Sequence, residues 1–314
     1  MIKFSRFTTA ASILALGLLT MPSLAQTAPA ASGTGDMHIT YTFTPTDVAA
    51  PVSEPMSYRL YVPASYNPKR AMPLVVLLHG AGGNENTILD EPDAPKIKSL
   101  ADKHGFIVLL PRGYKGGYGN IYPVVVTKET AARSAAAKLP GAVREAPPAE
   151  RPVVTKAVAV NDYAEQAASE LTPSRPNQLS EQEVLAAIAE VRKAYTIDAK
   201  RLYVTGNSMG GVGTAYLAAK YPAMWAAIAP SGGPLAAWSY PFARLRTNKV
   251  PALFVHGEID EHANPHWTEV NFNTAKAEGV DASLLIVKGA NHHDGWVQAI
   301  PQIFDFFDKH TRLK

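Results

Sequence analysis

The segment Gly-Asn-Ser-Met-Gly-Gly at residues 206–211 constrains the fold most, because it fits only a very tight turn. A strand-type run, Arg201–Thr205, precedes it, and a helix-forming run from Met209 to Lys220 follows it. In a strand–turn–helix of the G-x-S-x-G type, the positions two before and two after the serine must be small, and the hydroxyl projects from the turn. The sequence therefore predicts that Ser208 is a nucleophile at a helix N-terminus.

Strand and helix patterns alternate along the rest of the chain. The runs Pro73–Leu78 and Phe106–Leu110 are continuously apolar, which is typical of strands buried on both faces. A helix over 180–195 is expected to open with a capping box made by Ser180 and Glu183. Further strands are expected at 39–43, 58–62, 201–205, 225–229, 252–255 and 284–287, and helices at 95–103, 209–220 and 296–309. The alternation predicts an α/β fold with a mostly parallel central sheet and helices on both faces.

Residues 115–178 interrupt this alternation with a stretch rich in Ala and Pro. A loop that leaves the carboxyl end of a parallel strand lies over the site face of the sheet, so we interpret the stretch as an insertion over the active site. Between residues 115 and 156 it holds seven basic and three acidic residues, an excess of four positive charges. It is either a solvated flap or an electropositive guide for an acidic substrate.

The first 25 residues have the pattern of an export signal. Lys3 and Arg6 form a positive start, residues 10–19 are apolar, and Ser23 and Ala25 supply small residues at positions −3 and −1 of a cleavage site. The pattern predicts cleavage near Ala25 and a secreted or periplasmic protein without stable membrane insertion. A retained N-terminal anchor is the alternative.

Residues 26–36 are rich in Ala, Gly, Thr and Ser, which predicts a disordered lead-in. We expect residues 37–314 to form one domain that includes the insertion. The net charge of +3 is too small for a dedicated nucleic-acid binder. The chain has no cysteine, which excludes disulfides, thiolate metal sites and a cysteine nucleophile.

A serine hydroxyl needs a base to take its proton and an acid to orient that base. In chains with this turn, the acid and then the histidine follow the serine. Asp260 lies in the short acidic loop that follows the apolar run at 252–255 and is the candidate acid. Two histidines, His292 and His293, follow the next strand. We choose His292 as the base for its G-x-x-H spacing, which leaves His293 as a substrate-facing neighbour, and the choice between the two stays open.

Oxyanion donors are expected from two backbone N–H groups. One belongs to Met209, directly after the nucleophile. The other belongs to Ala81, with Gly82 as the alternative, because a buried strand ends there in the glycine-rich turn at residues 79–83. His79 is expected to brace this turn rather than to act on substrate.

Aromatic residues near these segments are candidates for binding substrate. Trp238 and Trp296 either line the site, together with His293, or pack elsewhere. Phe304, Phe306 and Phe307 belong either to the core or to an interface, which leaves a homodimer open. A metal site made by His292, His293 and Asp294 is an alternative, but no further ligand is spaced nearby, so we expect neither a metal nor a cofactor.

These residues give the chain a family resemblance over about residues 55–310. It resembles the α/β-hydrolase superfamily, and within it the secreted poly(3-hydroxybutyrate) depolymerase and feruloyl-esterase-like group. The resemblance is carried by Tyr58–Pro63, by the turn at 79–83 and by Tyr195–Gly211. It implies a Ser208–Asp260–His292 triad that acts through an acyl-enzyme.

The chain also departs from that group. Many members have disulfides, depolymerases of this type often have alanine where this chain has Met209, and no polymer-binding domain is appended. In organisation the chain is also similar to secreted poly(aspartic acid) hydrolases, and the basic insertion would suit a polyanion.

The sequence therefore predicts an exported serine hydrolase that cleaves ester or amide bonds, with poly(aspartic acid) β-amides as one specific hypothesis for the substrate. A carboxylesterase or polyester depolymerase is the alternative within the same chemistry. A non-catalytic binding protein on the same fold is the alternative from another class.

Overall fold

The computed structural model describes residues 33–46, 53–92, 94–114, 175–233 and 240–312. The expected signal peptide at 1–25 and residues 115–174 of the expected insertion lie outside the described residues. No helix within these ranges is both long and apolar enough to cross a lipid bilayer.

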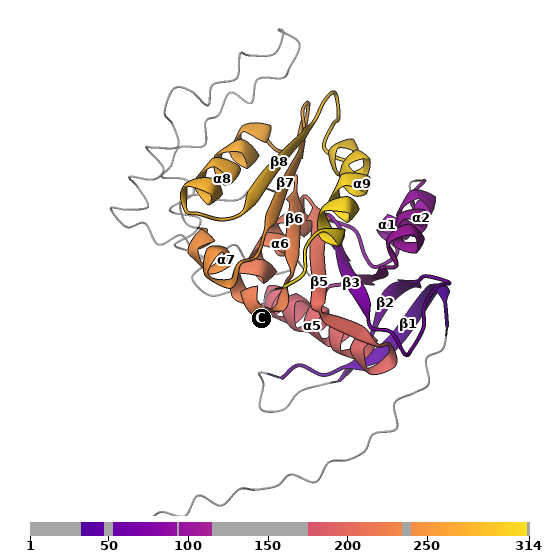
Figure 1. Ribbon diagram of the computed structural model, residues 1–314. Coiled ribbons are helices and arrows are strands. Elements are labelled where there is room, and N and C mark those ends of the chain that lie inside the picture. The colour runs from indigo at the N-terminus through magenta and orange to yellow at the C-terminus, as the bar shows by residue number, and fades with distance from the viewer. Residues whose placement is uncertain (1–32, 47–52, 93, 115–174, 234–239, 313–314) are drawn as a thin grey trace, which may run out of the picture.

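A single eight-stranded sheet runs through the described chain (Figure 1). The strand order is β1-β2-β4-β3-β5-β6-β7-β8; the β1–β2 and β2–β4 pairs are antiparallel and the others parallel. The strands are β1 (Gly35–Phe43), β2 (Glu54–Val62), β3 (Met72–Leu78), β4 (Ile107–Pro111), β5 (Ile197–Asn207), β6 (Ala227–Ser231), β7 (Ala252–Gly257) and β8 (Ala282–Val287). The predicted mostly parallel sheet is confirmed.

Helices cover both faces of this sheet and create two separate cores (Figure 1). Side chains alternate along β3, so Leu74, Val76 and Leu78 pack with α5 to α8, whereas Val75 and Leu77 pack with α1, α2 and α9. The helices are α1 (Thr87–Asp90), α2 (Ala94–His104), α5 (Arg175–Ala194), α6 (Met209–Lys220), α7 (Phe242–Asn248), α8 (Pro265–Ala277) and α9 (Asp294–Asp308), with a 3₁₀ turn at Pro222–Met224.

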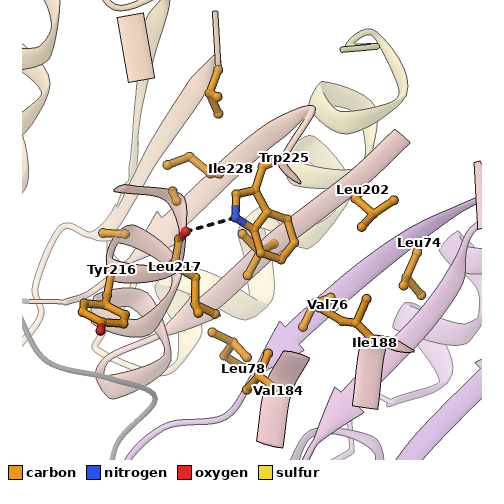
Figure 2. Close-up of a cluster of buried hydrophobic side chains, with 14 of the residues drawn as sticks. Leu74, Val76, Leu78, Val184, Ile188, Leu202, Tyr216, Leu217, Trp225 and Ile228 are labelled. Atoms are coloured by element: carbon orange, nitrogen blue, oxygen red, sulfur yellow. Dashed lines mark hydrogen bonds between the residues drawn. The ribbon is translucent and has the colours of Figure 1, made fainter. Parts of the chain in front are cut away.

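Trp225 anchors the larger core where the chain enters β6. Its side chain is fully buried, and its Nε1–H donates to the carbonyl of Leu217 in α6 at 3.2 Å (Figure 2). A buried indole needs a partner for this N–H, and the bond supplies one. The contact fastens α6, the helix that follows Ser208, to the strand beside it.

The expected capping box at the start of the long helix is wrong. α5 begins at Arg175, so Ser180 and Glu183 lie inside the helix. Their side chains accept hydrogen bonds from another segment: the N–H of Tyr114 donates to Ser180 Oγ, and the N–H of Gly113 donates to Glu183 Oε2, each at 2.8 Å. These two residues hold the chain that leaves β4 rather than the end of their own helix.

The boundary of the expected lead-in also needs correction. β1 begins at Gly35, so residues 35 and 36 are part of the sheet. Asp36 is held by Arg59 Nε at 2.7 Å and by Lys98 Nζ at 2.5 Å. These two cations fix the start of the strand in a way that a composition rich in small residues does not indicate.

Candidate active site

Ser208 lies at the tip of the turn between β5 and α6. Its backbone has φ 58° and ψ −119°. Non-glycine residues rarely adopt this strained conformation, and the exceptions cluster at functional sites. A Cβ at Gly206 would lie 2.5 Å from the carbonyl oxygen of Leu78, and one at Gly210 would collide with the same oxygen. The two glycines therefore let the first turn of α6 sit directly on the end of β3, as the motif predicts.

The opposite side of this turn rests on β6. A Cβ at Gly211 would collide with the carbonyl of Ser231, and the N–H of Ser208 donates to that same carbonyl at 2.9 Å. The position of Ser208 is thus fixed by β3 on one side and by β6 on the other. The half-buried hydroxyl has no hydrogen-bond partner among the described residues.

Asp260 lies three residues after β7, and its side chain is fully shielded from solvent. Oδ1 accepts hydrogen bonds from the N–H groups of His262 and Ala263, each at 2.8 Å. Oδ2 lies 2.7 Å from Nδ1 of His292 and 2.8 Å from Nε2 of His256. Burial alone would raise the pKa of Asp260, but the hydrogen bonds from both histidines and from the two N–H groups lower it well below its usual range.

His292 lies in the loop between β8 and α9. Because the ionised carboxylate of Asp260 can only accept, Nδ1 of His292 carries the hydrogen in this contact and Nε2 is left to accept a proton. The hydrogen bond to Asp260 raises the pKa of His292 above its ordinary value, and the charge of nearby Glu261 acts in the same direction. Asp260 thus fixes both the tautomer and the orientation of the His292 ring.

Asn207 brings the base loop next to the serine turn. Its Nδ2 donates to the main-chain carbonyl of His292 at 2.9 Å, and its Oδ1 accepts from Ser231 Oγ at 3.1 Å. A Cβ at Gly232 would lie 3.4 Å from Cε1 of His292, the carbon between the two ring nitrogens. The imidazole therefore faces the end of β6 that also supports Ser208. Sequence reasoning missed Asn207, and its only signal was its place directly before Ser208.

The two neighbouring histidines have different surroundings. His293 is half-exposed, and its Nε2 lies 3.6 Å from Glu91 Oε2. Among the described contacts of Asp260, the imidazole partners are His292 and His256. The structure thus brings His292 together with Asp260 and places His293 at the rim.

The glycine-rich turn after β3 lies beside Ser208. A Cβ at Gly80 would be 3.8 Å from Cβ of Ser208, and the next residue, Ala81, is exposed. The N–H of Met209 is the first of α6, and the first four N–H groups of a helix have no partner within it. His79 is buried, with Nε2 2.8 Å from the carbonyl of Arg112, and so braces the turn against the end of β4.

The two tryptophans expected at the site have different outcomes. Trp296 is buried, packs in the core on the face covered by α9, and donates its Nε1–H to Thr205 Oγ1 at 3.2 Å. The expectation that Trp296 binds substrate is therefore corrected, because its side chain is buried in the core between α9 and the sheet. Trp238 lies outside the described residues.

The described polar groups near the site do not form a metal centre. Within the described ranges, no group of three His, Asp or Glu side chains is placed to hold a metal ion. Both oxygens of Asp260 are already engaged by N–H donors.

Two curated relatives match part of the chain. A poly(3-hydroxyoctanoate) depolymerase of Pseudomonas fluorescens is 29% identical over 133 residues, covering 40% of this chain and 46% of the relative. A bifunctional acetylxylan esterase/xylanase of Neocallimastix patriciarum is 25% identical over 206 residues, covering 65% of this chain and 21% of the relative. The chain thus spans less than half the length of either relative.

Solved structures show the same fold. A ferulic acid esterase aligns with a TM-score of 0.55 at 14% identity, over 88% of this chain and 99% of that structure. A fluorophosphonate-binding serine hydrolase of Staphylococcus aureus aligns with a TM-score of 0.56 at 13% identity, over 87% of this chain and 99% of that structure. The family profile of the dienelactone hydrolases matches residues 61–294. That range covers well over half of the sequence and includes both Ser208 and His292, so the chain belongs to the dienelactone hydrolase family, with the α/β-hydrolase fold.

Proposed function

We propose that this protein is an exported serine hydrolase that cleaves carboxylic ester bonds through an acyl-enzyme on Ser208. The observation that carries the proposal is the 2.7 Å contact between Asp260 Oδ2 and His292 Nδ1, next to a serine held at positive φ. A serine alone is a weak nucleophile, and an oriented imidazole is what activates it.

The proposed chemistry is transfer of the acyl group to Ser208 followed by its hydrolysis. As Ser208 Oγ attacks the ester carbonyl, His292 Nε2 takes its proton, and the negative charge of Asp260 stabilises the imidazolium. The N–H groups of Met209 and Ala81 hold the developing oxyanion. When the intermediate collapses, the C–O bond to the alcohol breaks and His292 gives the proton to the leaving oxygen. A water molecule, deprotonated by His292, then releases the acid and restores the Ser208 hydroxyl.

The names of both curated relatives favour an ester as the substrate of this protein. One is named for a polyester of a hydroxy acid and the other for an acetylated polysaccharide. We therefore propose esters of an extracellular, polymeric substrate, with small soluble esters as convenient substitutes.

The decisive experiment is covalent labelling together with turnover. The protein is incubated with a fluorophosphonate probe and with p-nitrophenyl butyrate, and Ser208→Ala is compared with Ser99→Ala, which changes an exposed serine on α2. We expect Ser208→Ala to lose labelling and at least about 10³-fold in kcat, and Ser99→Ala to behave like the wild type. A wild-type protein that is neither labelled nor active would instead favour a non-catalytic binding protein.

A second candidate substrate is a polyanion such as poly(aspartic acid). The excess of four positive charges between residues 115 and 156 favours it. Cleavage of poly(aspartic acid), followed by mass spectrometry of the products, should fall as salt is raised, whereas cleavage of poly(3-hydroxybutyrate) should not. No products from poly(aspartic acid) at any salt concentration would remove this candidate and leave the esterase.

Export is tested at the N-terminus. The proposal expects the protein recovered outside the cytoplasm to begin at Gln26, after cleavage at Ala25. A recovered protein that still begins at Met1 would instead support the retained anchor.

A further inference from the structure

A second imidazole lies on the acid of the proposed triad. His256 belongs to β7 and is buried, and its Nε2 lies 2.8 Å from Asp260 Oδ2. That oxygen is the same one that His292 Nδ1 contacts at 2.7 Å. One carboxylate oxygen is thus shared between two imidazoles.

The surroundings of His256 fix its hydrogen positions. Nε2 also lies 3.0 Å from the carbonyl of Ala263, so both neighbours of Nε2 are acceptors and Nε2 carries the hydrogen. Nδ1 lies 2.6 Å from the hydroxyl of Thr268 in α8, which can donate to it. His256 therefore gives its Nε2–H to Asp260.

Sharing the oxygen has a chemical consequence. A carboxylate that already accepts one N–H on an oxygen holds less negative charge there for a second donor. The attraction between Asp260 and a protonated His292 is therefore weaker than it would be without His256. At the same time the N–H of His256 prevents the carboxylate from rotating away.

We propose that His256 is a positioning residue that fixes the carboxylate of Asp260 and limits how strongly that carboxylate favours the protonated form of His292. The proposal rests on the proposed function, in which His292 must be neutral to accept the proton of Ser208. His256 would thus keep a larger fraction of His292 neutral at lower pH, without itself contacting substrate.

Other groups also act on His292 and must be separated from His256. Glu261 accepts from the N–H of His292 at 3.3 Å, and its charge favours the imidazolium. The ring of His262 meets that of His292 edge to face, with centroids 5.0 Å apart. On the other side of Asp260, Thr268 is the polar group of α8 that faces His256.

The test uses variants that should shift the acid limb of the pH–activity profile in different directions. His256→Phe removes the N–H to Asp260, His256→Gln keeps an amide N–H near the place of Nε2, and Glu261→Gln removes a negative charge beside His292. The pH dependence of kcat/KM on p-nitrophenyl butyrate should move its acid limb up by about one pH unit in His256→Phe. The limb should stay near the wild-type position in His256→Gln and move down in Glu261→Gln.

A structural role alone would give a different pattern. KM should stay within about twofold in His256→Phe, because the buried side chain does not reach the substrate. A uniform loss of kcat with the acid limb unchanged in His256→Phe would overturn the proposal.

NMR titration of the imidazole of His292 provides a measurement that needs no activity. The pKa of His292 should rise in His256→Phe, and also, by less, in Thr268→Val, which removes only the hydroxyl that polarises His256 and serves if the Phe variant does not fold. An unchanged titration in the folded variants would overturn the proposal. A protein with the expected titration shifts but no fluorophosphonate labelling would refute the proposed function and leave the role of His256 in place.

Discussion

The side chain of Asn207 donates a hydrogen bond to the main-chain carbonyl of His292 at 2.9 Å, so the residue before Ser208 holds the backbone of the proposed base. The bond links two turns that are separated by 85 positions in the sequence. It fixes the backbone of His292 rather than its ring, whose orientation depends on Asp260.

Replacing this donor should misplace the base. Asn207→Asp puts a carboxylate oxygen against the carbonyl of His292, and we expect kcat to fall by about 10- to 100-fold with little change in KM. The control is Ser231→Ala, which removes only the hydroxyl that donates to Asn207 Oδ1 and should cost less than about fivefold. Equal kinetics in the wild type and Asn207→Asp would contradict this role.

The titration of His292 predicts how activity depends on pH. Its folded-state pKa is raised above the ordinary value of 6.5, chiefly by the hydrogen bond to Asp260. In the proposed mechanism the neutral ring accepts the proton of Ser208, so the acid limb of kcat/KM should lie above pH 6.5, and activity should fall as pH decreases through it. A limb below pH 6.5 would mean that burial outweighs the carboxylate.

Asp260 should contribute to stability only above acidic pH. Its folded-state pKa lies below the ordinary value of 3.8, so its stabilising contribution is complete above about pH 4 and is lost as pH falls toward the folded-state pKa. The difference in Tm between the wild type and Asp260→Asn should therefore shrink as pH is lowered from 5 to 2, as thermal melts would record. A constant difference would argue against the depressed pKa.

Glu183 should make stability depend on pH in the opposite direction. Burial raises its folded-state pKa from 4.5 to about 7, although Tyr41 and the N–H of Gly113 donate to the ionised form. The folded state then binds the proton more tightly, so stability should fall as pH rises from 4.5 to about 7, by on the order of 3 kcal/mol. Urea unfolding of Glu183→Gln should lack this slope, whereas Glu190→Gln on the same helix should keep it.

The close approach of α6 to β3 predicts which glycines tolerate a methyl group. Gly210→Ala would drive its Cβ into the carbonyl of Leu78, and we expect a loss of about 3 kcal/mol or more in the free energy of unfolding. Gly80→Ala is the matched control, because its Cβ would meet its nearest neighbour at 3.7 Å, an ordinary contact. Chemical denaturation that gives the two variants the same stability would refute this packing.

The sequence predicted well those features that depend on neighbouring residues. The continuously apolar run at 73–78 became β3, and the helix expected at 209–220 is α6 with the same bounds. The glycines around Ser208 carry strict steric information, since each meets backbone of an adjacent strand. Their roles follow from the turn itself and need no knowledge of the rest of the chain.

The errors concern side chains whose partners cannot be identified from the local sequence pattern. Ser180 and Glu183 have the spacing of a capping box, but they bind N–H groups more than 60 positions away. Trp296 follows the base loop, yet the register of α9 turns its ring under the sheet toward Thr205. His256 was missed because its partner, four residues on, lies beyond the end of a strand, where such spacing has no standard meaning.

The end of β3 supports two parts of the site at once. Leu78 pairs with Gly206 in the sheet, its carbonyl lies against Gly210, and the chain then turns directly into the glycine-rich loop. A change in the interior of this strand would therefore shift Ser208 and the glycine-rich turn together, and the distance between them would be preserved. Substitutions there should reduce solubility or thermal stability before they change substrate preference. Strand β3 is therefore a poor place to engineer selectivity and a good place to engineer stability.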